Sequence, residues 1–150
     1  MSEALKDLAQ RARVVQEALS WQGTPYHHMG RVKGAGVDCG ELLALVYDAA
    51  GVTPEIMPAA YNHDWHLHRG EEKYLAIVEA FAHRIEGPPL PGDIVLYQFG
   101  RCISHGAIVI QWPQVVHAYA VTGSVVLDDA EANLALAPRQ KGFWSCWGDK

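Results

Sequence analysis

The sequence is poor in cysteine and in basic residues, and it contains no long apolar run. Three cysteines in 150 residues are too few, and odd in number, for a disulfide framework. Twelve lysines and arginines against seventeen acidic residues give a net charge of −5, which argues against broad nucleic-acid binding. The longest strongly apolar run, 42–46, is far shorter than the roughly twenty residues of a membrane span. We therefore expect no nucleic-acid or membrane partner.

The N-terminus lacks the apolar stretch of an export signal, because it carries Glu3, Lys6 and Asp7. We expect the protein to be made in the cytoplasm without a signal peptide. The composition, 49% apolar and 19% charged, is that of an ordinary globular protein and excludes a disordered tail or a coiled coil. The length is about that of one domain, and no repeat or linker interrupts it. The sequence therefore predicts a single domain over 1–150.

Hydrophobic periodicity places helices first and strands later. Apolar residues at three- and four-residue steps predict an amphipathic helix over 2–21 with Ser2 as its N-cap. A buried helix is expected over 38–50, a loop over 52–70 and a third helix over 71–84. The later elements are strands at 93–99, 105–112, 115–121 and 124–127, a short helix at 130–136 and a strand at 142–146. This order predicts an α+β domain with N-terminal helices packed on an antiparallel sheet.

The segment Asp38-Cys39-Gly40-Glu41 is the strongest chemical signal. Asp38 is a good N-cap, and Glu41 follows at the spacing of a capping box. Cys39 then occupies the first helical position, where unpaired N–H groups and the helix dipole favour a thiolate. Taken alone, Cys39 is more often a small buried residue than a nucleophile, and the Glu41 carboxylate opposes thiolate formation.

Two histidines lie on neighbouring predicted strands. His105 opens an apolar strand, and His117 lies inside the next one. Adjacent antiparallel strands bring such residues side by side, so one imidazole would act as the base for Cys39 and the other would orient it. Each histidine alone has a simpler explanation, His105 as a surface residue at a strand end and His117 as a hydrogen-bonded core residue.

The order of cysteine, histidine and polar residue is that of papain-like cysteine peptidases, and the local motifs resemble the NlpC-type cell-wall peptidases. Five short motifs over residues 16–120 carry this resemblance. They are Gly23-Thr24-Pro25-Tyr26, Asp38-Cys39-Gly40, Pro91-Gly92-Asp93-Ile94-Val95, Ser104-His105-Gly106-Ala107 and Val116-His117-Ala118. The chain departs from the family at two positions beside the cysteine, where Gly40 replaces the usual serine and Glu41 the usual glycine.

The resemblance implies a papain-like fold and a role for each matching residue. Cys39 would be the nucleophile, His105 the general base and His117 the third, orienting residue. The remaining matches would support the substrate or the oxyanion: Tyr26, Asp38, Gly40 and Ser104. The resemblance implies no cofactor and no metal. The backbone N–H of Cys39 at the helix start would supply part of the oxyanion hole.

The implied reaction is hydrolysis of an amide bond in a peptidoglycan stem peptide, through an acyl-enzyme on Cys39. The family commonly cuts between D-glutamate and a diamino acid. The compact form resembles members encoded by bacteriophages, so we expect possible partners among phage tail-tip proteins and action at the cell wall.

Three alternatives stay open. The run His63-Asp64-Trp65-His66-Leu67-His68 has the residue types of a zinc site, although no second cluster matches it. A catalytically silent tail or assembly protein would keep the fold without the reaction. A related papain-like amidase or acyltransferase would use the same thiol for another reaction.

Overall fold

The computed structural model describes residues 2–53 and 73–148. The helices are α1 (Glu3–Ser20), α2 (Cys39–Ala49), α3 (Lys73–Glu79) and the 3-10 helix η3 (Ala137–Arg139). The strands are β1 (Arg31–Val32), β2 (Gly36–Val37), β3 (His83–Ile85), β4 (Ile94–Phe99), β5 (Cys102–Gln111), β6 (Gln114–Tyr119), β7 (Ser124–Asp129) and β8 (Gln140–Ser145). None of the described helices is long and apolar enough to cross a bilayer.

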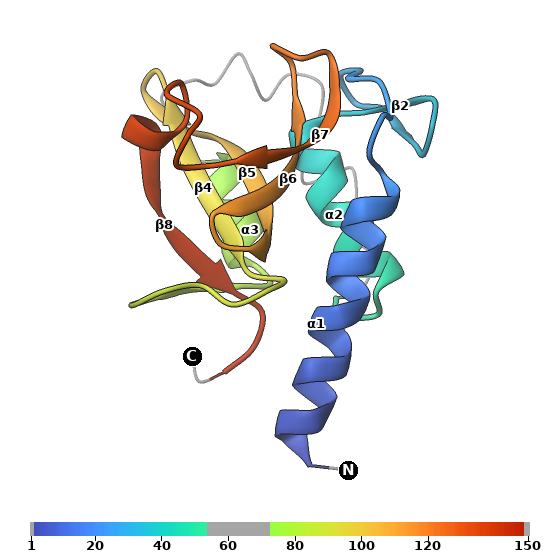
Figure 1. Cartoon of the computed structure of the whole chain (residues 1–150), viewed down its shortest axis with the longest axis vertical. Helices are drawn as coiled ribbons and strands as arrows, with labels where there is room; N and C mark the ends of the chain where they lie inside the picture. The colour runs from blue at the N-terminus through green and yellow to red at the C-terminus, as the bar shows by residue number, and fades with distance from the viewer. Residues whose placement is uncertain (1, 54–72, 149–150) are drawn as a thin grey trace.

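Six of these strands form one antiparallel sheet in the order β3-β8-β4-β5-β6-β7. The strands from β4 to β7 follow one another as a meander, and β8 returns to the other side of β4. Helices α1 and α2 lie beside the sheet, while the N-terminal end of α1 extends beyond the rest of the molecule (Figure 1). The predicted α+β class, with N-terminal helices on an antiparallel sheet, is confirmed.

The start of α1 is the predicted one, because the Ser2 Oγ accepts the N–H of Leu5 at 3.2 Å. The face that α1 buries is narrower than its apolar stripe. Val14 and Ala18 are fully buried, whereas Leu5 and Leu8 are more than half exposed. The sequence pattern therefore predicts the helix correctly but overstates how much of it packs on the body.

The structure corrects two predicted helices. The helix expected over 71–84 ends at Glu79 within the described residues, and His83–Ile85 instead form β3, which pairs with β8. The helix expected over 130–136 is a series of turns. There the Asp129 carboxylate accepts two backbone N–H groups and the Asn133 side-chain oxygen accepts that of Ala135. Such local bonds from Asp and Asn compete with helix formation. The predicted loop over 52–70 lies largely outside the described residues.

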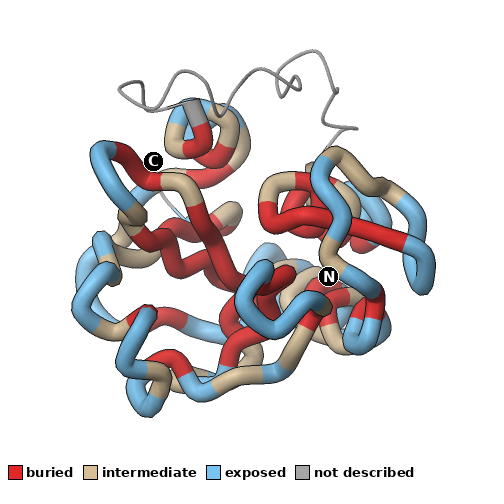
Figure 2. Tube along the Cα trace, turned by 90° about the horizontal axis from the view of Figure 1, so that it is seen from above, coloured by how far each residue is buried: buried red, intermediate tan, exposed pale blue. Residues whose placement is uncertain are grey.

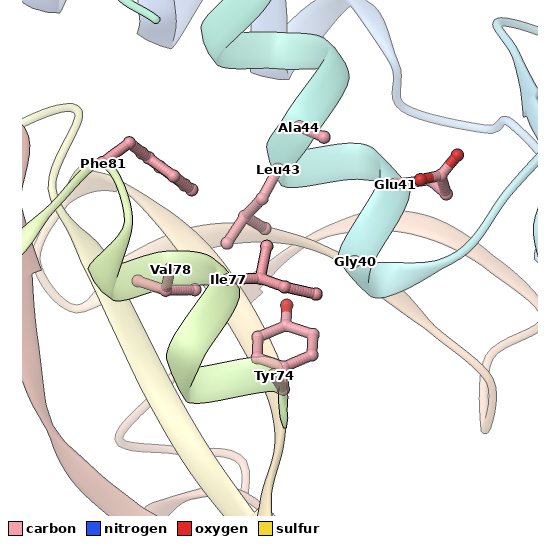
Figure 3. A pocket seen from close by; sticks show the side chains of 8 residues that line it. All are labelled: Gly40, Glu41, Leu43, Ala44, Tyr74, Ile77, Val78 and Phe81. Carbon is pink, nitrogen blue, oxygen red and sulfur yellow. The ribbon is translucent and has the colours of Figure 1, made fainter. Parts of the chain in front are cut away.

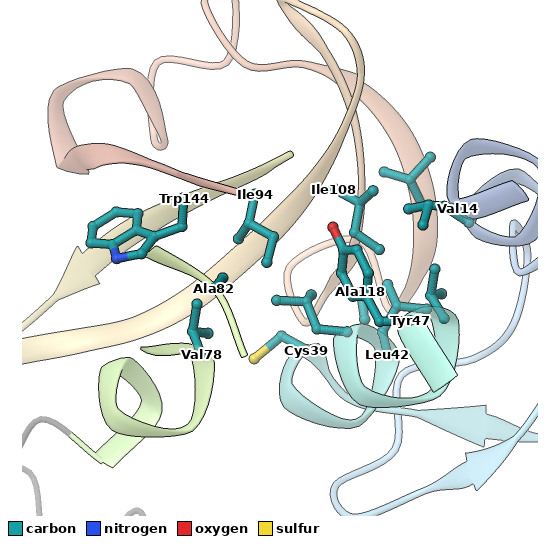
Figure 4. Packing of buried hydrophobic residues seen from close by; sticks show 14 of the residues in the cluster. Val14, Cys39, Leu42, Tyr47, Val78, Ala82, Ile94, Ile108, Ala118 and Trp144 are labelled. Atoms are coloured by element: carbon teal, nitrogen blue, oxygen red, sulfur yellow. The ribbon is translucent and has the colours of Figure 1, made fainter. Parts of the chain in front are cut away.

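Helix α2 packs its apolar residues on one face of the sheet, and this contact forms the main core. The buried positions gather in α2 and the central strands, while the turns are exposed (Figure 2). Leu42 and Tyr47 of α2 pack with Ile94 and Ile108 of the sheet, and Cys39 belongs to the same cluster (Figure 4). The nucleophile candidate is therefore held on a rigid element rather than on a loop.

The Pro91-Gly92-Asp93 motif ties α1 to the sheet. The buried Asp93 carboxylate accepts hydrogen bonds from Arg11 of α1 at 2.9 Å and from the Leu90 N–H at 2.9 Å. The Tyr47 hydroxyl donates to the Gly92 carbonyl, so α2 is anchored at the same place. This motif has a structural role at the start of β4.

Candidate active site

Asp38 fixes the start of α2 and with it the position of Cys39. One Asp38 carboxylate oxygen accepts the Glu41 N–H at 2.9 Å, and the other accepts the Met29 N–H at 2.7 Å. The predicted N-cap is confirmed. The Glu41 carboxylate, which lies at the spacing of a capping box, accepts a 2.7 Å hydrogen bond from Arg31 Nε of β1. Asp38 thus supports the site through the backbone.

Strands β5 and β6 bring the two histidines together, as the sequence predicts. The distance from His105 Nε2 to His117 Nδ1 is 2.8 Å. The other ring nitrogen of His117, Nε2, lies 3.0 Å from Asp128 Oδ2 at the end of β7. Asn133 Nδ2 donates to the same Asp128 oxygen at 2.8 Å. A connected chain therefore runs from His105 through His117 to Asp128.

The hydrogen-bond chain sets the tautomers of both rings. The Asp128 carboxylate accepts the proton of His117 Nε2, so the neutral His117 ring presents an unprotonated Nδ1. His105 Nε2 donates to that nitrogen, which leaves His105 Nδ1 as an acceptor. Burial raises the pKa of Asp128, but hydrogen bonds from Asn133 and His117 outweigh this effect and hold it below its ordinary value. The carboxylate at the end of the chain is charged.

One cleft contains both Cys39 and His105. It encloses about 530 Å³ of empty space including its open mouth. Its lining is Tyr26, Cys39, Phe99, Ser104, His105, Ala118, Tyr119, Ala120 and Val121. The Cys39 Sγ donates to the Ser104 carbonyl at 3.6 Å. Four of the residues predicted for the site, Tyr26, Cys39, Ser104 and His105, therefore share one cavity, and His117 lies directly behind His105.

Burial favours the neutral forms of both the Cys39 thiol and the His105 imidazole. Burial, followed by the nearby Asp38 carboxylate, raises the pKa of the Cys39 thiol to about 12. A hydrogen bond from the Tyr74 side chain, followed by the backbone N–H groups of Gly40 and Cys39, lowers the pKa, but less than burial raises it. Burial and the adjacent His117 lower the pKa of His105 to about 3. Burial therefore opposes the thiolate that the helix N-terminus favours.

This protonation state predicts slow alkylation of Cys39 at neutral pH. A thiol with a raised pKa should react with iodoacetamide about tenfold faster for each pH unit between pH 7 and 9, as its thiolate fraction grows. Peptide mapping by mass spectrometry distinguishes Cys39 from Cys102 and Cys146, and the unfolded protein is the control for an ordinary thiol. Rapid modification of Cys39 at pH 6 would instead reveal a preformed thiolate–imidazolium pair.

Two tyrosines flank the cysteine. Burial, followed by the nearby Cys39 and Asp38, raises the pKa of Tyr26, so its hydroxyl stays protonated and able to donate. The Tyr74 hydroxyl of α3 donates to the Cys39 carbonyl at 3.1 Å. Sequence reasoning did not find Tyr74, because only the packing of α3 on α2 brings this residue to the nucleophile.

The chain also matches a known protein family. The profile of the NlpC/P60 family matches residues 23–141, which include Cys39, His105, His117 and Asp128. The chain belongs to the NlpC/P60 family. The comparison with curated proteins gave no match.

Solved structures of NlpC/P60 proteins have the same fold. The NlpC/P60 domain of the peptidoglycan hydrolase SagA has a TM-score of 0.61 at 19% identity, over 89% of this chain and 96% of that one. The peptidoglycan hydrolase RipB from Mycobacterium tuberculosis has a TM-score of 0.61 at 19% identity, over 97% and 67%. RipD from the same organism, a non-catalytic NlpC/p60 domain protein, has a TM-score of 0.58 at 14% identity, over 90% and 95%. These likenesses establish the shared fold.

Gly40 and Glu41, the two positions beside Cys39 where the chain differs from the family pattern, line a second pocket. This pocket, between α2 and α3, encloses about 350 Å³ of empty space and is largely apolar (Figure 3). Its lining is Gly40, Glu41, Leu43, Ala44, Tyr74, Ile77, Val78 and Phe81. Gly40 lines this second pocket rather than the cleft with His105, while its backbone N–H acts on the Cys39 thiol. Burial raises the pKa of Glu41 to about 7, although Arg31 opposes the shift.

The histidines, cysteines and acidic residues form no candidate metal site in the described ranges 2–53 and 73–148. No group of three or more potential metal ligands occurs there. The candidate zinc run, 63–68, lies outside the described residues. None of the three cysteines forms a disulfide, which agrees with the prediction from their number.

Proposed function

We propose that the chain is a cysteine peptidase that hydrolyses an amide bond of a peptidoglycan stem peptide through an acyl-enzyme on Cys39. The observation that carries the proposal is the shared cleft of Cys39 and His105, backed by the His117–Asp128 chain. Membership of the NlpC/P60 family supports it, as does the shared fold of SagA and RipB, both of which are peptidoglycan hydrolases.

In the first half-reaction Cys39 Sγ attacks the substrate carbonyl while its proton passes to His105 Nδ1. The developing oxyanion lies near the helix start, where the Cys39 N–H and the Tyr26 hydroxyl are donors. The charge on the His105 imidazolium is stabilised through His117 by the Asp128 carboxylate. His105 then gives its proton to the leaving nitrogen, the C–N bond breaks, and a thioester on Cys39 remains.

In the second half-reaction His105 Nδ1 accepts a proton from water, and the resulting hydroxide attacks the thioester. The C–S bond breaks, the carboxylic acid leaves, and Cys39 regains its proton from His105. No external oxidant, reductant or metal enters this balance. Because burial raises the pKa of the thiol, we expect its deprotonation to occur together with attack on a bound substrate.

The finer proposal is that the bond joins D-glutamate to a diamino acid and that the enzyme acts at the cell wall as part of a phage tail tip. It rests on the sequence resemblance alone. Co-purification with tail particles would support the tail-tip setting, and absence from intact particles would contradict it.

The test of the reaction is a digestion of purified stem peptides followed by mass spectrometry. We expect two products whose masses add up to substrate plus one water and identify the bond. Acyl transfer to an added amine without hydrolysis would instead indicate an acyltransferase. Unchanged peptides and intact cell-wall sacculi would contradict the proposal and favour a silent binding protein, as in the case of the non-catalytic RipD.

A further inference from the structure

A third cavity, a groove next to the catalytic cleft, is lined by two cationic side chains. It is formed where β4 ends and β8 begins, and its lining is Gln98, Gly100, Pro138, Arg139 and Lys141. Arg139 and Lys141 are both exposed. Neither forms an ion pair with a carboxylate in the described part of the chain, whereas Arg11, Arg31 and Lys33 all do. In a protein with a net charge of −5, this groove is a local patch of positive charge.

The Arg139 guanidinium is held in place before any ligand binds. Its Nη1 donates to the Ala135 carbonyl at 2.8 Å, and its Cζ lies 4.9 Å from the centre of the Phe99 ring. These two contacts fix the plane of the guanidinium and leave other N–H donors for a ligand. A fixed arginine binds a carboxylate in a defined orientation, because its donors match the two carboxylate oxygens.

Phe99 connects this groove to the reacting atoms. Its ring lines the catalytic cleft with Cys39 and His105. It meets the His105 ring edge-on, with centroids 5.9 Å apart and an interplanar angle of 89°. Arg139 is thus separated from the catalytic histidine by a single aromatic ring.

The chemistry of the proposed reaction decides which part of a substrate reaches Arg139. His105 must protonate the leaving nitrogen, so the leaving amino acid has to lie against His105. Phe99 packs on the His105 ring and Arg139 packs on Phe99, so both extend from the residue that the leaving amino acid has to approach. We infer that Arg139, assisted by Lys141, binds a free carboxylate on the amino acid that leaves as the amine. This inference rests on the proposed function and adds a determinant of substrate choice to it.

The test compares two stem peptides that differ only at that carboxylate, which is free in one and a carboxamide in the other. For the wild type we expect kcat/KM to be about tenfold higher for the carboxylate, the effect of one exposed charge-assisted hydrogen bond. Arg139→Gln should abolish this preference, Lys141→Gln should reduce it, and Arg139→Lys should retain part of it. Lys6→Gln, which removes one exposed charge from α1, is the matched control and should keep the full preference.

Two results would overturn the inference. One is a wild type that does not discriminate between the peptides. The other is an Arg139→Gln protein that loses activity equally on both, since that would assign Arg139 only to the support of Phe99. If the wild type cleaves neither peptide, the proposed function fails, and binding decides the inference separately. NMR titration of the Cys39→Ala protein should then still show tighter binding of the carboxylate peptide, and equal binding would overturn it.

Discussion

Replacing Cys39 with alanine is expected to lower kcat for stem-peptide hydrolysis by about 10⁴-fold or more, because covalent catalysis loses its nucleophile. Cys39 is the cysteine that lines the cleft with His105, whereas neither Cys102 nor Cys146 belongs to that lining. The fold should survive, since alanine fits the space of the buried thiol and is a good helix former. Steady-state rates and a thermal unfolding curve check both statements.

Cys102→Ala and Cys146→Ala are the matched controls for this substitution. Each removes one thiol and should leave kcat within about threefold of the wild type, as expected for changes outside a catalytic site. A Cys39→Ala protein that still hydrolyses the peptide would contradict the covalent mechanism. A Cys102→Ala protein that loses activity while folding normally would move the nucleophile to β5.

Replacing Asp128 with asparagine should lower kcat by about 10- to 100-fold and leave KM nearly unchanged. Asparagine keeps an oxygen that accepts the His117 Nε2–H and the Asn133 amide, so the rings keep their tautomers. The negative charge that stabilises the imidazolium is lost. The loss in kcat should be smaller than that caused by removing Cys39 or His105. The reason is that the His117 ring lies between Asp128 and His105, and Asp128 is partly exposed to solvent.

Asp129→Asn is the control for Asp128→Asn, since it removes the neighbouring exposed carboxylate. Asp129 accepts backbone N–H groups of the following turn, and as the next residue of β7 its side chain lies on the opposite face of the strand from Asp128. It should leave kcat within about twofold, as expected of an exposed site. Equal effects of the two substitutions would show that the turn, rather than the His117 partner, is what activity requires.

The sequence predicts those parts of the site that depend on short motifs and on neighbouring elements of the chain. The capping residue Asp38, the position of Cys39 at the first turn of α2, and the pairing of His105 with His117 on adjacent strands all follow from motifs and strand alternation. The meander itself follows from β-branched runs separated by short turns.

The residues that sequence reasoning missed depend on long-range register and packing. Asp128 faces His117 because the pairing of β6 with β7 sets His117 opposite Val126, so the residue two positions on lies on the same face. Tyr74 reaches Cys39 only through the packing of α3 on α2, and Arg139 reaches Phe99 only because β8 returns beside β4. The burial that raises the pKa of Cys39 is also hidden from the sequence, whereas the helix N-terminus that favours a thiolate is visible there.

The most direct test of a thiol peptidase is the intact mass of the wild-type protein quenched in acid during turnover of a stem peptide. The proposed mechanism predicts a fraction of protein heavier by the mass of the acyl fragment, with the label mapping to Cys39 and disappearing on treatment with hydroxylamine. Turnover with no such adduct, or with the adduct on another residue, would contradict the assignment of Cys39 as the nucleophile.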